Sequence, residues 1–290
     1  MTNSSGNRLK DYLELSKLKI MIPVCLTGFT GYFAFNPYFS PNLFLTTLGI
    51  LFMAVSASVL NQMQEVEIDN KMNRTRFRPL PSQRIELKYA AIFFTINLAA
   101  GILLLFFAGN IKAVFVGLIT ILWYNGVYTY SKRITAFAVV PGAITGALPP
   151  LIGWVAAGGG PWEKQIIFIE FLIFTGQIPH FWLLILKYGE EYKKAGLPNI
   201  TDIFSRIQIN RITFSWVISS VFAALFLCYF EIIQSPFIIV FLVIASIYIL
   251  WQFFGLLKMN ADKNPKKYSI LLDSYFLLVL LLLISDKIIS

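Results

Sequence analysis

Apolar stretches of about 20 residues recur along the whole chain, and this recurrence restricts its fold more than any other feature. About 20 mostly apolar residues in a helix cross roughly 30 Å of hydrocarbon. Of the 290 residues, 57% are hydrophobic and 13% are charged, against about 25% charged in ordinary soluble domains. The pattern predicts nine transmembrane helices, near residues 20–36, 43–61, 89–108, 112–130, 137–157, 165–186, 212–230, 236–256 and 268–285.

The connections between these stretches carry no long polar linker or low-complexity segment. Residues 1–290 are therefore predicted to form a single all-α membrane domain. Cys25 and Cys228 both lie in apolar stretches, where a cysteine usually serves as a small buried side chain. We expect neither a disulfide nor a metal site from this pair.

Lysine and arginine are distributed unequally between the two sets of loops. All but three of the 24 basic residues fall at the N-terminus or in the loops on its side of the membrane, the exceptions being Lys112, Lys164 and Lys287. Because basic residues are retained in the cytoplasm, the N-terminus is predicted inside and the C-terminus outside. The formal charge of +9 then forms one basic surface, suited to the anionic lipid of a bacterial cytoplasmic (inner) membrane.

The end of the second stretch carries a dense cluster of opposite charges, "NQMQEVEIDNKMNRTRFRPLP", at residues 61–81. Asn61, Glu65 and Asp69 are four residues apart, so on a helix that continues from this stretch they share one face. Mg²⁺ is usually held by one or two carboxylates together with the phosphates of a substrate. This spacing therefore predicts a magnesium site, whereas Glu67 falls off the shared face and is expected to be solvated.

Three arginines follow the carboxylates, at positions 74, 76 and 78, before Pro79 and Pro81 stiffen the loop. Guanidinium groups grip phosphate oxygens through planar pairs of donors. A metal and arginines around a diphosphate turn it into a leaving group, because they neutralise the charge that develops as its C–O bond breaks. The alternative is a charged helix end with internal salt bridges at the membrane surface.

A second cluster, "GQIPHFWLLILKYGEEYKKAGLPN" at residues 176–199, contains the only histidine of the chain. Gln177, His180, Lys187 and Glu191 follow helical spacing and are predicted to project from one stripe. Ionisable groups inside a membrane usually face a cavity or a partner, so this stripe is a candidate second wall of the site. The alternative is a histidine that is satisfied in the core.

The first cluster, N-x-x-x-(D/E)-x-x-x-D followed by "NRTRFRP", resembles the first aspartate-rich motif of the UbiA superfamily of intramembrane prenyltransferases. Q-x-P-H-F in the second cluster resembles the protohaem IX farnesyltransferase (haem O synthase) branch, as do "YSKRITAFAVVPGAITGALPPLIGW" (130–154) and "ELSKLKIMIPVCLTGFTGYFA" (14–34). The resemblance covers the first six predicted helices. It departs at Glu65 and Glu191, where the superfamily usually has aspartate, and at Leu18, where it often has proline.

The resemblance implies a UbiA-type bundle that transfers a farnesyl group from farnesyl diphosphate to a vinyl group of haem b, with addition of water, giving haem O. It implies Mg²⁺ held by Glu65 and Asp69, with Asn61 as a further catalytic residue. The implied diphosphate-binding residues are Arg74, Arg78, Tyr130, Lys132 and Arg133. The fifth helix, rich in glycine and proline, is expected to be kinked and thin so that a large planar ligand or a long chain can approach.

In this reading His180 faces the haem, either as an axial ligand of the iron, as a donor to a propionate, or in a purely structural part. Gln177, Lys187 and Glu191 would share its wall. Two other functions remain open: a UbiA-type enzyme with an aromatic acceptor such as a quinone precursor, and a haem-binding or transport protein without chemistry. Expected partners are the lipid bilayer and haem A synthase or assembly factors of terminal oxidases, with no nucleic acid.

Overall fold

All regular secondary structure is helical within the residues that the computed structural model describes, 5–257 and 264–289. The helices are α1 (Ser5–Ser16), α2 (Leu18–Phe35), α3 (Pro41–Gln64), α4 (Val66–Lys71), α5 (Leu87–Ala108), α6 (Ile111–Leu122), η1 (Trp123–Tyr128), α7 (Thr129–Ile134), α8 (Val139–Ala156), α9 (Lys164–Lys194), η2 (Ile200–Asp202), α10 (Arg206–Tyr229), α11 (Pro236–Phe254), η3 (Gly255–Leu257) and α12 (Pro265–Ile289). In these ranges nine helical segments are long and apolar enough to cross a membrane, with α6, η1 and α7 forming one of them. The predicted all-α fold with nine transmembrane helices is confirmed.

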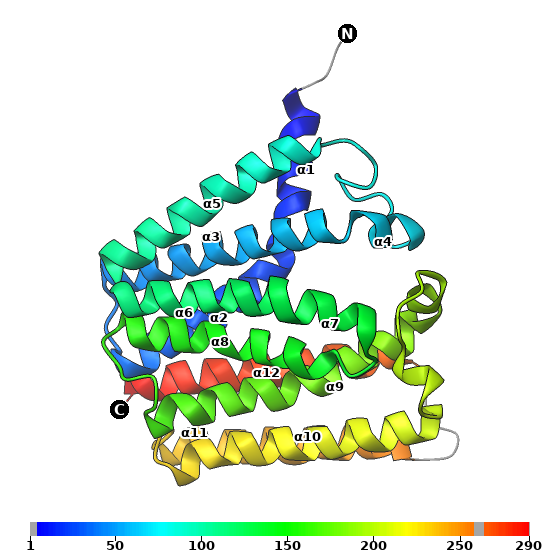
Figure 1. Ribbon diagram of the computed structural model, residues 1–290. Helices are drawn as coiled ribbons and strands as arrows, with labels where there is room; N and C mark the ends of the chain where they lie inside the picture. The colour runs from blue at the N-terminus through cyan, green and yellow to red at the C-terminus, as the bar shows by residue number, and fades with distance from the viewer. Residues whose placement is uncertain (1–4, 258–263, 290) are drawn as a thin grey trace.

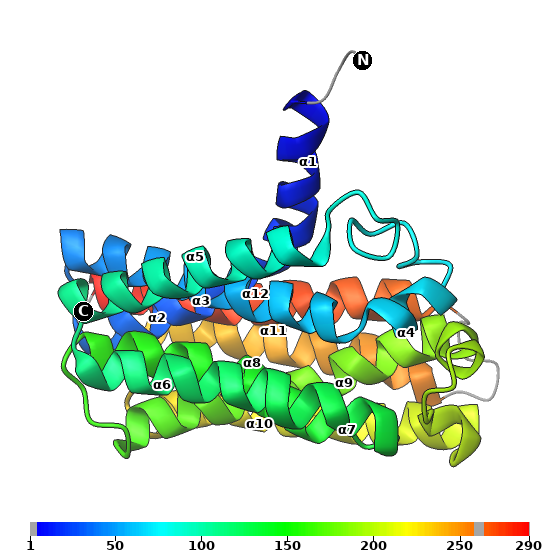
Figure 2. The ribbon, with the colours of Figure 1, turned by 45° about the horizontal axis from the view of Figure 1, so that its top comes forward.

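The spans lie side by side in one bundle (Figure 1), and α1 lies at a steep angle to them in both views (Figures 1 and 2). α3 packs along α5, α2 packs along α8, and α9 contacts α8, α10 and α12. The C-terminal end of α12 lies at one end of the bundle, and α4 lies at the other. We call the end with α4, the loop 72–86 and the C-terminal turns of α7 and α9 the basic end. The lysines of the loop 258–263, also predicted on this side, lie outside the described residues.

The outer surface of the bundle is strongly apolar. Phe107 is 77% exposed, Trp251 69% and Phe237 67%. A soluble protein rarely exposes such side chains over a wide continuous surface. In a membrane, where lipid replaces water around the helices, these side chains face hydrocarbon without a cost.

Several helices begin at side chains that satisfy their free backbone N–H groups. Ser40 accepts from the N–H of Leu43 at the start of α3, directly before a proline at the first helical position. Ser205 and Gln208 form a capping box at the start of α10. Such caps fix the residues at which these helices begin, because an unpaired N–H is costly wherever water is scarce.

The helix α9 extends eight residues beyond the sequence-based boundary at residue 186. Its 31 residues correspond to about 46 Å at a rise of 1.5 Å per residue, longer than the roughly 30 Å of hydrocarbon. Polar residues end the hydropathic signal but not the helix, which stops where Gly196 adopts a φ of 77° and its N–H binds the carbonyl of Lys193. The final turns therefore project over the basic end.

The continuous helix predicted over residues 61–69 is wrong. α3 ends at Gln64, α4 starts at Val66, and Glu65 between them has φ −109° and ψ 10°. The Asp69 N–H still binds the Glu65 carbonyl at 2.8 Å, so the four-residue hydrogen-bond spacing of a helix resumes directly after the bend at Glu65. The bend turns the following loop over the basic end of the bundle.

The helix α8 remains one helix although it contains Pro149 and Pro150. Its small residues instead allow close contact with α2: a methyl group at Gly153 would overlap the carbonyl of Gly28, and one at Gly31 would overlap the carbonyl of Pro150. Small residues let membrane helices approach through their backbones. The contact fixes α2 against α8 beside the cavities described below.

We expect Gly31→Ala to destabilise the solubilised protein by about 1–3 kcal/mol, because the added methyl group forces α2 away from α8. Gly126→Ala is the matched control, since nothing lies within 4 Å of a Cβ placed there. Thermal unfolding in detergent measures both. Equal midpoints for the two variants would show that α2 and α8 tolerate separation.

Candidate functional site

A cavity of about 220 Å³ opens between α3, α4, η1, α7 and α9 at the basic end. Asn61, Glu65 and Asp69 all line it, although the helix that carries them is bent. Their exposed fractions are 2%, 8% and 4%, so three polar side chains are buried on one wall. Its other polar or charged lining residues are Lys17, Arg74, Arg78, Tyr124, Tyr128, Lys132, Thr135, Tyr192 and Asn199.

Each buried carboxylate has a basic partner. Arg78 Nη1 lies 2.7 Å from Asp69 Oδ2, and Lys132 Nζ lies 2.5 Å from Glu65 Oε1. A carboxylate removed from water requires such a partner, because leaving it alone costs several kcal/mol. The two cations come from the loop after α4 and from α7, so segments far apart in the sequence meet at this cavity.

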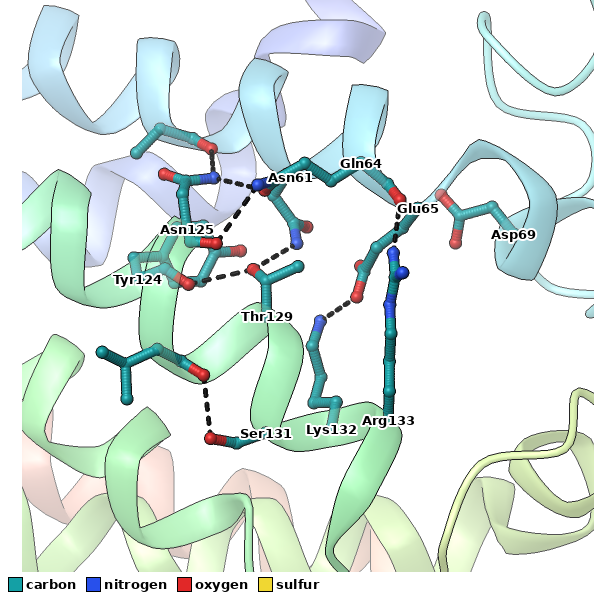
Figure 3. Close-up of polar contacts among 12 residues, drawn as sticks. Asn61, Gln64, Glu65, Asp69, Tyr124, Asn125, Thr129, Ser131, Lys132 and Arg133 are labelled. Carbon is teal, nitrogen blue, oxygen red and sulfur yellow. Dashed lines mark hydrogen bonds and ion pairs between the residues drawn. The ribbon is translucent and has the colours of Figure 1, made fainter.

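A network of hydrogen bonds links Asn61 and the end of α3 to η1 and α7 (Figure 3). Asn61 Nδ2 donates to Thr129 Oγ1 at 3.0 Å, and Thr129 donates to the carbonyl of Tyr124 at 2.9 Å. Asn125 Nδ2 donates to Gln64 Oε1 and to the carbonyl of Ala57, both at 3.1 Å. Because Asn61 donates through its amide nitrogen, its Oδ1 is the atom that could bind a cation.

The short π-helix η1 supplies Tyr124 and Tyr128 to the cavity and Asn125 to the network. A π-turn inside an α-helical span is rare and is frequent at functional sites. Gly126 in the same turn faces open space, since nothing lies within 4 Å of a Cβ placed there. Sequence reasoning missed this element, since its residues continue the apolar pattern of α6.

The loop after α4 is tied to the end of α9. Arg74 lines the cavity, its guanidinium lies 4.7 Å from the ring centroid of Tyr188, and its backbone N–H donates to Glu191 Oε2 at 3.0 Å. Glu191 thus binds the loop backbone and is not among the residues that line either cavity. Its role in the described structure is to hold Arg74 in place.

Besides Glu191, three further predicted site residues line neither of the two cavities of the bundle. Arg133 Nη2 donates to the carbonyl of Gln64 at 2.6 Å and so caps the end of α3. Tyr130 is 49% exposed with Arg133 over its ring, and Lys187 is exposed over the ring of Tyr188. Arg133 and Lys132 are adjacent on α7, so their side chains point to different neighbours.

Lys17, which we had not predicted as a site residue, lines the cavity from the junction of α1 and α2. It adopts a left-handed conformation with φ 49°, unusual for a residue other than glycine. Burial, and next the guanidinium of Arg78, lower the pKa of the Lys17 ammonium to about 7. The only sequence signal was its place in "SKLK", which reads as an ordinary basic residue before a span.

A second cavity of about 340 Å³ lies beside the first, between α2, α3, α6, η1, α8 and α9. Its walls are mostly apolar, and Gln177 and His180 from α9 are among its few polar side chains. The stripe predicted on α9 therefore divides: two residues face this cavity and two do not. The two cavities are adjacent, because both are lined by Ile20, Tyr124, Tyr128, Phe181 and Leu184.

Two glycines of α8 widen this apolar cavity. Gly142 and Gly146 line it, and a methyl group at either position would meet the ring of Tyr128 or the side chain of Gln177, respectively. The predicted thin face of the fifth span therefore exists. It lies toward η1 and α9, whereas Gly153 and Pro150 pack on α2.

Residues 21–280 match the UbiA prenyltransferase family. The chain belongs to this family. It is 37% identical over 166 residues to the protoheme IX farnesyltransferase of Geobacter sulfurreducens, an alignment that covers 57% of this chain and 61% of that protein. It is 34% identical over 190 residues to the one of Nitratidesulfovibrio vulgaris strain DP4, covering 66% of each chain. The alignments thus span slightly less than two thirds of the length of these relatives.

Solved UbiA structures share the fold. A digeranylgeranylglyceryl phosphate synthase superposes with a TM-score of 0.79 at 22% identity, covering 98% of this chain and 100% of that one. A UbiA homologue from Archaeoglobus fulgidus bound to GPP and Mg²⁺ superposes with a TM-score of 0.68 at 19% identity, covering 96% and 98%. The UbiA-type helical bundle is confirmed, and the second of these structures contains a metal together with GPP.

The donors in the charged cavity fit a magnesium ion. Glu65, Asp69 and Asn61 offer oxygen atoms from one wall, and Mg²⁺ prefers oxygen ligands. No group of three or more His, Cys, Asp or Glu side chains within residues 5–257 and 264–289 is arranged to hold a metal. The protein's two carboxylates therefore suit an ion that also takes oxygens from a substrate phosphate, which is how Mg²⁺ is usually bound.

Proposed function

We propose that this UbiA prenyltransferase transfers a farnesyl group from farnesyl diphosphate to a vinyl group of haem b, with addition of water, to give haem O. The observation that carries the proposal is a charged cavity directly adjacent to an apolar cavity that His180 lines. The relatives at 34–37% identity that bear the name protoheme IX farnesyltransferase support the same acceptor. The first cavity suits a metal and a diphosphate, and the second suits a prenyl chain and a flat apolar ring.

In this proposal Glu65, Asp69 and Asn61 hold Mg²⁺. Arg74, Arg78 and Lys132 bind the diphosphate. To do so, Arg78 leaves Asp69 and Lys132 leaves Glu65, the carboxylates with which they are paired in the structure. When bound, Mg²⁺ neutralises the negative charge that develops on the diphosphate as its C–O bond breaks. The side chains of Arg78 and Lys132 in this cavity are only 22% and 17% exposed, and a donor that is partly removed from water is worth more than one in solution.

The apolar walls protect the allylic cation that forms when the electron pair of the C–O bond leaves with the diphosphate. The π electrons of the haem vinyl group then form the new C–C bond. Water adds to the resulting cation beside the ring and releases a proton. Tyr124, Tyr128 and Phe181 line both cavities, so in this proposal their rings shield the reacting carbon from bulk water during transfer.

The deciding experiment is to express the chain in cells that cannot make haem O and to weigh the extracted haems by mass spectrometry. We expect a haem whose mass has increased by one farnesyl group and one hydroxyl group. Unmodified haem b together with a prenylated aromatic compound would replace the proposal with the aromatic-acceptor alternative. Haem b alone, bound but unmodified, would indicate a haem-binding or transport protein.

Lys17 should make diphosphate binding depend on pH. With a pKa of about 7, its amine is charged below pH 7 and mostly neutral above pH 8. A bound diphosphate favours the charged form, so above pH 7 binding takes up a proton and affinity falls, by at most about tenfold per pH unit. Titration calorimetry with farnesyl thiodiphosphate and Mg²⁺ between pH 7.5 and 9 measures this slope.

The variant Lys17→Met is the control for that measurement. It should bind the analogue more weakly at pH 7.5 and show a smaller slope, because the titrating amine is gone. An unchanged slope would assign the pH dependence to another group.

The proposed activity also implies where the protein lies in the cell and which proteins take up its product. The protein is a multi-pass integral membrane protein, and we place its basic end in the cytoplasm of a bacterium, where farnesyl diphosphate is soluble. Haem A synthase or assembly factors of terminal oxidases would take up the product.

A further inference from the structure

The histidine of the apolar cavity has a carboxylate partner on a helix that the sequence motifs do not reach. His180 Nδ1 lies 2.7 Å from Asp273 Oδ1, across 93 residues of sequence. His180 lines the apolar cavity, whereas Asp273 stands beside it and is not among the lining residues. An ionisable side chain inside a transmembrane helix is costly and usually faces a cavity or a partner.

The packing of α9 on α12 explains why the two side chains meet. Gly176 leaves room for the ring of Phe276, which occupies the place of a side chain at that position. The two helices run in opposite directions, so one turn further along α9, at His180, the facing residue on α12 is one turn earlier, at Asp273. The pair is therefore fixed by a helix contact and does not depend on a mobile loop.

We propose that Asp273 positions His180 to ligate the iron of the haem acceptor, an inference that rests on the proposed function. A carboxylate accepts a hydrogen bond only from a protonated nitrogen, so in the neutral imidazole Nδ1 carries the proton and Nε2 keeps its lone pair. Nε2 is the ring nitrogen left for the cavity. Histidines that bind metals commonly donate their other N–H to a carboxylate, which fixes the ring and raises the basicity of the ligand.

The assignment gives α12 a part in acceptor binding. The charged cavity holds the donor through α3, α4 and α7, whereas α9 and α12 together hold the acceptor. A ligand to iron would hold the haem in the apolar cavity, so His180 would set how far the vinyl groups lie from the prenyl donor. Asp273 touches neither substrate and acts through His180 alone.

The test is resonance Raman spectroscopy of ferrous haem b added to the purified full-length protein in nanodiscs. The wild-type protein should show an iron–histidine stretching band. Asp273→Asn keeps the shape but weakens the acceptor, so the band should shift to lower frequency. Asp273→Leu should lose at least about tenfold in haem affinity. His180→Gly should lose the band, and added imidazole should restore it.

Glu170→Gln is the control, because it removes the carboxylate of another acidic side chain on α9, the helix of His180, and Glu170 lines neither cavity. A band in wild-type protein that Asp273→Asn leaves unchanged would overturn the role of Asp273. Bound haem without an iron–histidine band would overturn the ligation, even if haem O is produced and the proposed function stands. Absence of both haem binding and haem O would overturn the inference together with the proposed function.

Discussion

Asp69→Asn should abolish prenyl transfer, with a loss of at least about a thousandfold in turnover, on the order of 4 kcal/mol of transition-state stabilisation. The buried carboxylate of Asp69 lies on the cavity wall 2.7 Å from Arg78. The amide is the same size but cannot balance the charge of a divalent cation, so the metal and the diphosphate would lose their anchor. Transfer of radiolabelled farnesyl groups in purified membranes measures the effect.

Glu67→Gln is the control for Asp69→Asn. Glu67 is also acidic and lies two residues away on α4, but it is exposed and lines neither cavity. It should retain nearly full activity, and both variants should be inserted to the parental level. If Asp69→Asn transfers farnesyl groups at the parental rate, the metal-binding role of this wall is refuted.

Removal of Mg²⁺ should have an effect of similar size. With EDTA in excess, transfer should fall to background. Two carboxylates line the charged cavity, so without the metal they repel the diphosphate, and the negative charge that develops on the leaving group is not neutralised. Added Mg²⁺ should restore the rate. Ca²⁺ should restore it poorly, since it takes longer bonds and more ligands than Mg²⁺.

The control for chelation is the thermal midpoint of the protein, which EDTA should leave nearly unchanged. The fold depends on helix packing, and Glu65 and Asp69 have Lys132 and Arg78 as partners. Full transfer activity in excess EDTA would be incompatible with a magnesium-dependent mechanism.

The nine spans and the carboxylate wall were predictable from the sequence, each for a physical reason. A bilayer requires long apolar helices with their backbone bonds satisfied, so hydropathy alone finds the nine spans to within a few residues at most boundaries. Asn61, Glu65 and Asp69 share a wall because the bend at Glu65 keeps the four-residue step. Local spacing was sufficient for both features.

The remaining features depend on contacts between distant segments. Arg133 and Lys132 are neighbours in sequence, but only packing decides that one caps α3 while the other meets Glu65. Lys17 resembles any basic residue at the start of a span until α1 turns away and leaves it facing the cavity. The partnership of His180 with Asp273 joins positions 93 residues apart and needs the contact between Gly176 and Phe276 to exist first.

The long helix α9 has a consequence for which prenyl donors the enzyme can use. His180 on the apolar cavity and Tyr192 on the charged cavity belong to the same helix, roughly 18 Å apart along its axis. This separation cannot be adjusted in small steps, because one inserted residue would also rotate the two sets of side chains by about 100°. Selectivity for the length of the isoprenoid should therefore reside in side-chain volume on the apolar walls, at positions such as Ile121 and Ile152.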